Sequence, residues 1–411
     1  MRPISSLLAT HGDFWDPAQV IPILTLIETI KPSTLPADLT YHTAIRQLTN
    51  TMKAIWLDCD PGHDDATAIM LAVHCSNVSL LGVSTVHGNA SHYNIQLNAA
   101  RCLEAFGADP SIKVYPGAVK PLIRPVRYDS EIHGGDGLGG VEGLPSPDDP
   151  RICERLNHPG GPVRAIEAIA KAIKESWKDG SGERVVVISS GPMTNIALFV
   201  SVYPELLGGV EEFVFMGGAV GLGNRSAVAE FNILCDPEAA QIVLDAPVKK
   251  IMIPLNVTHT AIFTKAHHSS LLNSEIIQDI AESTSELLKA SSPLRHMLST
   301  LLGFFASTYK STFGFHLGPP IHDALTVAYV SQPELFRCTR YRVDVELNGT
   351  HTSGETVVDI WNYRETDDTW GNTGKNTLVA ETLDVDGFFK LFMECVTRDI
   401  IVDAPPNYKD Y

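Results

Sequence analysis

The sequence predicts an α/β fold in which helices flank a largely parallel sheet with an antiparallel edge. Short apolar runs that are typical of buried strands alternate with helical runs along most of the chain, as they do in parallel sheets. The most acidic stretch begins where the first strand stops, and ligands bind at the carboxyl ends of strands in open α/β sheets. Two later runs, residues 341–347 and 356–361, have the pattern of a hairpin and indicate that the sheet is mixed at one edge.

The elements follow one another from residue 54. The first strand covers 54–57, Pro61-Gly62 breaks the chain, and a helix over 66–73 has Asp64 and Asp65 in its first turn. Further strands are predicted at 78–86, 112–115, 184–189, 213–216 and 250–255, with helices at 91–106 and 195–201. A helix over 386–397 closes the fold.

Composition limits the class of partner. The chain has 411 residues, of which 44% are hydrophobic and 19% charged, as in an ordinary globular protein with a large core. Its formal net charge of -17 argues against a nucleic-acid partner, because such partners require a basic surface. A small neutral or cationic substrate suits this charge better.

The cysteines and apolar runs predict a cellular location. The seven cysteines show no paired spacing for disulfides and no zinc pattern, which favours a reducing compartment. No apolar run is long enough to span a membrane, and the start of the chain lacks the features of a secretory signal. The sequence therefore predicts a cytoplasmic protein with no membrane partner.

Two segments stand apart from the alternating pattern. Residues 1–52 mix proline, threonine and apolar residues, with a short helix predicted at 20–30. We interpret them as an extension of unknown role, followed by a single domain over 53–411. Residues 121–162 are rich in glycine, proline and aspartate, and a structureless segment of this length is expected to be a functional lid or disordered.

Four carboxylates lie within eight residues at the end of the first strand, in the stretch Asp58-Cys59-Asp60-Pro61-Gly62-His63-Asp64-Asp65. Like charges this close raise one another's pKa, and a hard divalent cation such as calcium or magnesium is the simplest way to keep them ionised. The alternative is that the last two acids only complement the dipole of the helix while the others are solvated.

Two known acidic motifs fit this stretch poorly. An EF-hand loop would require a third acid and its spacer where Pro61-Gly62 stands. Phosphatases of the haloacid dehalogenase type carry Asp-x-Asp-x-Thr after their first strand, but residue 62 is glycine. Phosphoryl transfer is therefore only a distant alternative.

Polar motifs also follow the later strands, and together they resemble the nucleoside hydrolases, the calcium-dependent N-ribohydrolases of the inosine-uridine-preferring type. The matching segments are 58–65, 86–89, 132–134, 136–139, 191–197, 216–218, Asn224, 230–232, 236–240 and 322–324. They occur in the family's order over about residues 53–400. The resemblance implies a single-domain, Rossmann-like α/β fold that lacks a dinucleotide-binding loop and assembles as a homodimer or homotetramer.

The resemblance also implies a calcium site. Asp60, Asp65 and Asp323 would bind Ca²⁺ through their carboxylates and Thr194 through its main-chain carbonyl, and all of these are the hard oxygen ligands that calcium prefers. Asp60 would in addition be the base for the water molecule that the cation holds.

Further residues correspond to the substrate site of the family. Those that would bind the ribose hydroxyls are Asp64, Asn89, Asn224, Glu230 and Asn232, with Met216 lying under the sugar. His322 would protonate the departing base, and His133 is a second candidate on the base side. Histidine suits this task because its pKa lies near neutrality.

The predicted function is hydrolysis of the N-glycosidic bond of free ribonucleosides to ribose and nucleobase, in nucleoside salvage, with uridine or inosine preferred. Splitting this bond builds positive charge on the sugar, which an acid-rich pocket stabilises in the transition state. Two alternatives stay open. The chain could be a catalytically inactive module that binds calcium or ribose, or a ribosyltransferase that uses an acceptor other than water.

Other notable residues are interpreted as structural. Cys59 has no histidine partner in its sequence neighbourhood and is expected to pack in the interior. His63 is left outside the metal site. The aromatic residues at 304–315 have helical spacing, which is more typical of a core than of a surface that stacks on a nucleobase.

Overall fold

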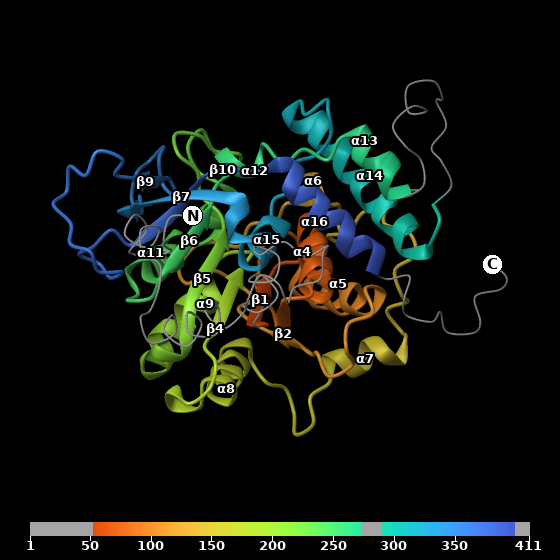
Figure 1. The fold of residues 1–411 in the computed structure, drawn as a ribbon, viewed down its shortest axis with the longest axis horizontal. Helices are drawn as coiled ribbons and strands as arrows, with labels where there is room; N and C mark the ends of the chain where they lie inside the picture. The colour runs from red at the N-terminus through yellow and green to blue at the C-terminus, as the bar shows by residue number, and fades with distance from the viewer. Residues whose placement is uncertain (1–51, 273–289, 399–411) are drawn as a thin grey trace, which may run out of the picture. The chain divides into compact units, whose positions relative to one another are not determined.

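A computed structural model describes residues 52–272 and 290–398. Eight strands form one sheet in the order β3-β2-β1-β4-β5-β6-β10-β7, and β8 pairs with β9 in a separate hairpin (Figure 1). The strands are β1 (Lys53–Cys59), β2 (Val78–Thr85), β3 (Val114–Pro116), β4 (Val185–Ser189), β5 (Val210–Met216), β6 (Lys250–Ile253), β7 (Phe336–Tyr341), β8 (Val343–Val345), β9 (Thr356–Val358) and β10 (Thr377–Leu383). The large sheet is parallel apart from the antiparallel pairing of β10 with β7.

Helices cover both faces of this sheet. They are α4 (His63–His74), α5 (His92–Ala105), α6 (Ser130–His133), α7 (Pro150–Leu156), α8 (Ala165–Trp177), α9 (Thr194–Val202), α10 (Phe231–Cys235), α11 (Pro237–Asp245), α12 (Leu255–Thr258), α13 (Lys265–Leu272), α14 (Pro293–Phe313), α15 (Ala324–Ser331) and α16 (Val385–Arg398). None of the helices in the described part of the chain is long and apolar enough to cross a membrane.

The central strand β1 shows why both faces are covered. Successive side chains of a strand point to opposite faces. Ile55 and Leu57 join a buried cluster with side chains of α4, α5, α14, α15 and α16, whereas Ala54 and Trp56 join a second cluster with side chains of α8, α9 and α11. A strand that is apolar on both sides needs two helical layers, which is typical of parallel sheets.

The predicted fold class is confirmed, and the predicted elements lie close to their expected positions. The run at 54–57 is the centre of β1, and the helix expected at 66–73 is α4. The hairpin expected at 341–347 and 356–361 is the β8–β9 pair. However, this hairpin does not form the antiparallel edge of the large sheet, since β7 does.

Strands β7 and β10 were not predicted. Most side chains of β7, in the sequence FRCTRY, are only partly buried, and it includes two arginines. An edge strand of this kind lacks the apolar run that marks a buried strand. Strand β10 mixes buried and partly exposed residues in TLVAETL, so its pattern is equally weak.

The segment expected to be a lid contains the short helices α6 and α7. Its glycine-rich part is closely packed: a Cβ on Gly137 would lie 2.9 Å from that of Ala90, and one on Gly140 would lie 2.6 Å from the ring of Phe304 in α14. The extension predicted over 1–52 and the helix at 20–30 lie outside the described residues, apart from Met52.

Candidate active site

The acidic stretch folds into a tight turn between β1 and α4, and the turn directs Asp65 inwards. The backbone amide of Gly62 donates to Oδ2 of Asp65 at 3.0 Å, and the amide of Asp60 donates to Oδ1 at 3.3 Å. The hydroxyl of Ser190, which follows β4, also donates to Oδ1 at 2.7 Å. These donors stabilise the ionised form, but burial outweighs them and raises the pKa of Asp65 to about 6.

Asp60 lies at the carboxyl end of β1 and is fully buried. Its Oδ2 accepts a hydrogen bond of 2.9 Å from the amide of Asn89, in the loop after β2. Its Oδ1 is buried without a hydrogen-bond partner among the described residues. Burial, followed by the charge of Asp65, raises the pKa of Asp60 well above its usual range. A buried carboxylate oxygen without a partner is costly unless a cation or a proton occupies the space beside it.

Asp323 completes a cluster of three acids. It precedes α15, and its carboxylate lies with those of Asp64 and Asp65 so that one oxygen from each falls within 4.8 Å of the others. Burial and then the neighbouring carboxylate of Asp64 raise the pKa of Asp323. These three carboxylates offer the oxygen ligands that a hard divalent cation takes. Two of them, Asp65 and Asp323, are predicted calcium ligands, whereas Asp64 was predicted to bind ribose, and the predicted ligand Asp60 is not in this group.

The side-chain hydroxyl of Thr194 bonds to residues outside this cluster. Its hydroxyl donates to Asp236 at 2.7 Å and lies 2.8 Å from Nε2 of His87. Its predicted role therefore depends on the main-chain carbonyl alone. The turn that carries Thr194 comes close to the acids, since a Cβ on Gly191 would lie 2.5 Å from Oδ1 of Asp60.

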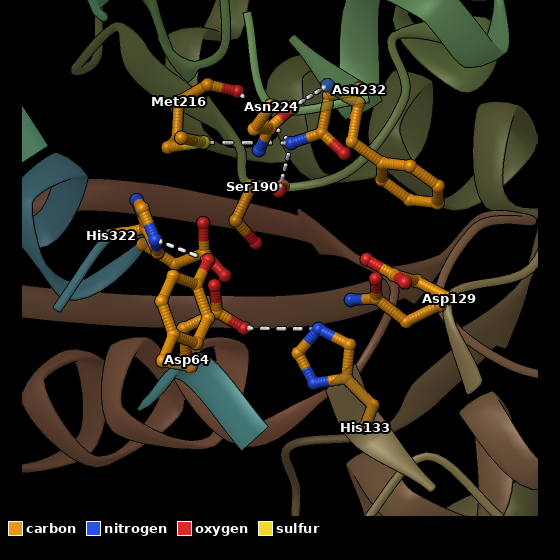
Figure 2. Close-up of a pocket in the computed structure, with 12 residues that line it drawn as sticks. Asp64, Asp129, His133, Ser190, Met216, Asn224, Asn232 and His322 are labelled. Atoms are coloured by element: carbon orange, nitrogen blue, oxygen red, sulfur yellow. Dashed lines mark hydrogen bonds and ion pairs between the residues drawn. The ribbon is translucent and has the colours of Figure 1, made fainter. Parts of the chain in front are cut away.

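Asp64 and Asp323 line a polar cavity of about 30 Å³, shown in Figure 2. The residues that line it are Asp64, Asn89, Asp129, His133, Ser190, Met216, Asn224, Phe231, Asn232, Tyr309, His322 and Asp323. The structure thus brings most of the predicted site residues to one cavity, from loops that follow different strands. The predicted residues Asp60, Asp65, Thr194 and Glu230 do not line it.

Glu230 has a different position from the other predicted ribose ligands. It is the N-cap of α10, and its carboxylate accepts hydrogen bonds from the amides of Asn232, Ile233 and Gly218. These contacts hold the turn that presents Asn232 to the cavity. The side-chain nitrogen Nδ2 of Asn232 in turn donates to the main-chain carbonyl oxygens of Ser190 and Met216, at 2.8 and 3.2 Å.

The two predicted histidines reach the cavity on either side of Asp64 (Figure 2). Nε2 of His322 is 2.7 Å from the hydroxyl of Tyr309, and its Nδ1 is 2.8 Å from the hydroxyl of Thr258. Nε2 of His133 is 4.0 Å from Oδ1 of Asp64. Burial lowers the pKa of both rings well below the usual range, so both are neutral near pH 7.

Sequence reasoning missed several cavity residues. Tyr309 was assigned to the aromatic core, and it does pack against Phe305 and Phe313, yet its hydroxyl reaches His322. Asp129 was missed because it lies in the lid segment, where it pairs with Arg225. Helical spacing identifies the buried face of a helix but cannot tell which member of that face borders a cavity.

Gly88 allows a direct test of this geometry. A Cβ on Gly88 would lie 1.8 Å from Oδ2 of Asp60, so Gly88→Ala must displace that carboxylate. Since Asp60 is the predicted base, we expect the variant to fold but to lose about 100-fold in kcat/KM, the cost of a displacement of about 1 Å at a reacting group. Gly303→Ala is the matched control, because a Cβ there would meet nothing within 4 Å. Equal activity of the two variants would show that the position of Asp60 does not matter.

The fold is an α/β fold with buried acids and a polar cavity near the carboxyl ends of its parallel strands. The family model for inosine-uridine preferring nucleoside hydrolases matches residues 55–390. The chain belongs to this family, and it is an enzyme that hydrolyses ribonucleosides.

Individual relatives agree with this assignment. A probable ribonucleoside hydrolase of Dictyostelium discoideum is 36% identical over 355 residues, which cover 85% of this chain and 96% of the relative. The pyrimidine-specific ribonucleoside hydrolase RihA of Escherichia coli O7:K1 is 36% identical over 341 residues, which cover 83% of this chain and 97% of the relative. Among solved structures, a purine-preferring ribonucleoside hydrolase from Gardnerella vaginalis matches with a TM-score of 0.68 at 27% identity, covering 84% of this chain and 99% of that chain.

Proposed function

We propose that the chain is a calcium-dependent hydrolase that cuts the N-glycosidic bond of free ribonucleosides, with uridine or inosine preferred. The observation that carries the proposal is the buried cluster of Asp64, Asp65 and Asp323, two of which, Asp64 and Asp323, line a polar cavity. Among the described residues, Oδ1 of the neighbouring Asp60 has no hydrogen-bond partner. So many buried carboxylates would repel one another if they were ionised without a cation.

The donor set fits a hard divalent cation. Asp60, Asp65 and Asp323 would hold it through carboxylate oxygens, with the main-chain carbonyl of Thr194 as a further ligand. Oxygen ligands alone favour calcium or magnesium over zinc, and the family resemblance supports calcium. When bound, the cation would supply a water molecule that gives up its proton more readily than bulk water.

The remaining chemistry belongs to the side chains. Asp60 accepts the proton of the attacking water while the water oxygen bonds to C1′ of the ribose. The C1′–N bond breaks, and its electron pair goes to the departing base. Asn89, Asn224 and Asn232 orient the ribose hydroxyls, and the buried acids stabilise the positive charge that develops on the sugar.

The departing base takes up a proton from His322, which its hydrogen bonds to Tyr309 and Thr258 hold in place. Burial lowers the pKa of His322, so the resting ring carries one proton near pH 7. It takes up a second proton from solvent and passes one to the departing base, and the proton that Asp60 took from the water molecule is later released to solvent. His133, across Asp64 from His322, is a second polar group for the base side (Figure 2).

The choice of nucleobase is tested by a comparison of substrates. The relatives named above include a pyrimidine-specific and a purine-preferring enzyme, so the family membership alone does not decide it. We expect uridine and inosine to give higher kcat/KM than cytidine, adenosine and guanosine when release of reducing sugar is measured. A clear preference for one of the other three would contradict the proposed specificity.

The wider setting is also a proposal. The cysteine usage and acidic charge support a cytoplasmic enzyme of nucleoside salvage that acts on small molecules and binds no nucleic acid. The family resemblance supports a homodimer or homotetramer, and sedimentation of the purified protein would distinguish these from a monomer.

A further inference from the structure

His63 does not line the cavity, but it contacts α14, His133 and the glycine-rich segment, and it lies next to the acidic turn. It is the first residue of α4, next to the acidic turn, and it is fully buried. Its ring stacks on Phe304 and Phe305 of α14, with ring centroids at 5.0 and 5.6 Å and interplanar angles of 7° and 3°. Through its ring nitrogens it contacts His133 and the glycine-rich part of the segment 121–162.

The contact with the glycine-rich segment determines which nitrogen of the His63 ring carries the proton. Nε2 of His63 is 2.9 Å from the carbonyl oxygen of Gly139, which can only accept a hydrogen bond. Nε2 therefore carries the proton. In this tautomer Nδ1 of His63 holds a lone pair.

Two groups of His63 meet the same atom of His133. The ring nitrogen Nδ1 of His63 is 3.3 Å from Nδ1 of His133, and with Nε2 committed to Gly139 it can only accept. The backbone amide of His63 is 3.1 Å from Nδ1 of His133 and can only donate. His63 thus offers a partner to His133 whether Nδ1 of His133 is protonated or not.

We propose that His63 is a positioning residue for His133, which it holds in one orientation while the proton of the His133 ring changes place between Nδ1 and Nε2. The inference rests on the proposed function, in which His133 faces the departing base. With Nδ1 protonated, Nε2 of His133 accepts a hydrogen bond from the substrate, and with Nδ1 unprotonated, Nε2 donates one. If only one donor faced Nδ1 of His133, the His133 ring would be held in a single tautomer.

Two variants separate this role from simple packing. In His63→Gln, the glutamine side chain can place its amide near the position of Nε2 and keep the contact with Gly139, but the acceptor beside His133 is lost. In His63→Asn, the asparagine side chain can place its oxygen near the position of Nδ1 and keep that acceptor, but the contact with Gly139 is lost. His351→Gln, at an exposed histidine, is the control for the substitution itself.

The readout compares two substrates. The departing base of uridine requires protonation or a hydrogen bond from the enzyme, whereas the nitrophenolate of 4-nitrophenyl riboside departs without a proton. We expect His63→Gln to lower kcat for uridine by about 10- to 100-fold, the usual cost of removing a group that orients a functional histidine, with little change in KM. The kcat for 4-nitrophenyl riboside should change much less, and His63→Asn should recover most of the loss on uridine.

The ratio of the two activities in one sample does not depend on the folded fraction, so a partly unfolded variant still gives an answer. Equal losses on both substrates, or losses in His63→Asn as large as those in His63→Gln, would assign His63 to packing only and overturn the inference. An unchanged rate on uridine in His63→Gln would also overturn it. A wild-type protein that releases neither uracil nor nitrophenolate would contradict the proposed function itself, and the inference with it.

Discussion

Asp60→Asn is expected to lower kcat for uridine hydrolysis by about 10² to 10⁴-fold, the usual contribution of a general base. Asparagine has nearly the shape of aspartate, and its oxygen can still accept the hydrogen bond that the amide of Asn89 donates to Oδ2. It cannot take a proton from water, and it offers a weaker ligand to a cation. The rate of ribose release at saturating uridine and calcium measures the effect.

Asp179→Asn is the matched control for this substitution. Asp179 is exposed, and its backbone has a φ of 52°, a conformation that asparagine also tolerates. The control should retain the wild-type rate. If Asp60→Asn kept more than a tenth of the wild-type kcat, another group would have to be the base.

Removal of calcium is expected to lower the unfolding temperature by several degrees near pH 7 and by less near pH 5. In the absence of a cation, burial raises the pKa of Asp65 to about 6 and that of Glu230 to about 7. A carboxyl group whose pKa is raised in the folded state binds its proton more tightly there, so the folded state loses stability as the pH rises from the unfolded pKa to the folded pKa.

For Asp65 this window runs from about 3.8 to about 6, and the loss is complete above it. A shift of this size corresponds to a loss on the order of 3 kcal/mol in the free energy of unfolding. A bound cation keeps the carboxylates ionised and removes the penalty. Thermal unfolding of calcium-loaded and calcium-free protein between pH 5 and pH 8 measures the difference, and a difference that did not grow with pH would contradict a cation site at these acids.

The acid site could be predicted from the sequence because much of it is local. Asp60, Asp64 and Asp65 lie in one strand-turn-helix unit, where an apolar run, Pro61-Gly62 and a second apolar run mark the boundaries. The family resemblance then connected this unit with distant residues such as Asp323, and the structure brings Asp323 to the same cluster as Asp64 and Asp65.

Other features could not be predicted because they depend on distant contacts. The sequence gives no sign that Tyr309 reaches a histidine 13 residues further on, since its spacing only identifies it as part of a buried helix face. His63 and His133 are 70 residues apart, and no local pattern pairs them. The edge strand β7 was missed because its mostly half-buried side chains show no apolar periodicity.

Ribose release from uridine in water, with calcium and after its removal, tests the central claim most directly. The account predicts equal amounts of ribose and uracil without any added acceptor, loss of both products in calcium-free buffer, and recovery when calcium is restored. Uridine that stays intact while it binds would indicate an inactive binding module. Uracil release that requires a ribosyl acceptor other than water would indicate a transferase, and either result would contradict calcium-dependent hydrolysis.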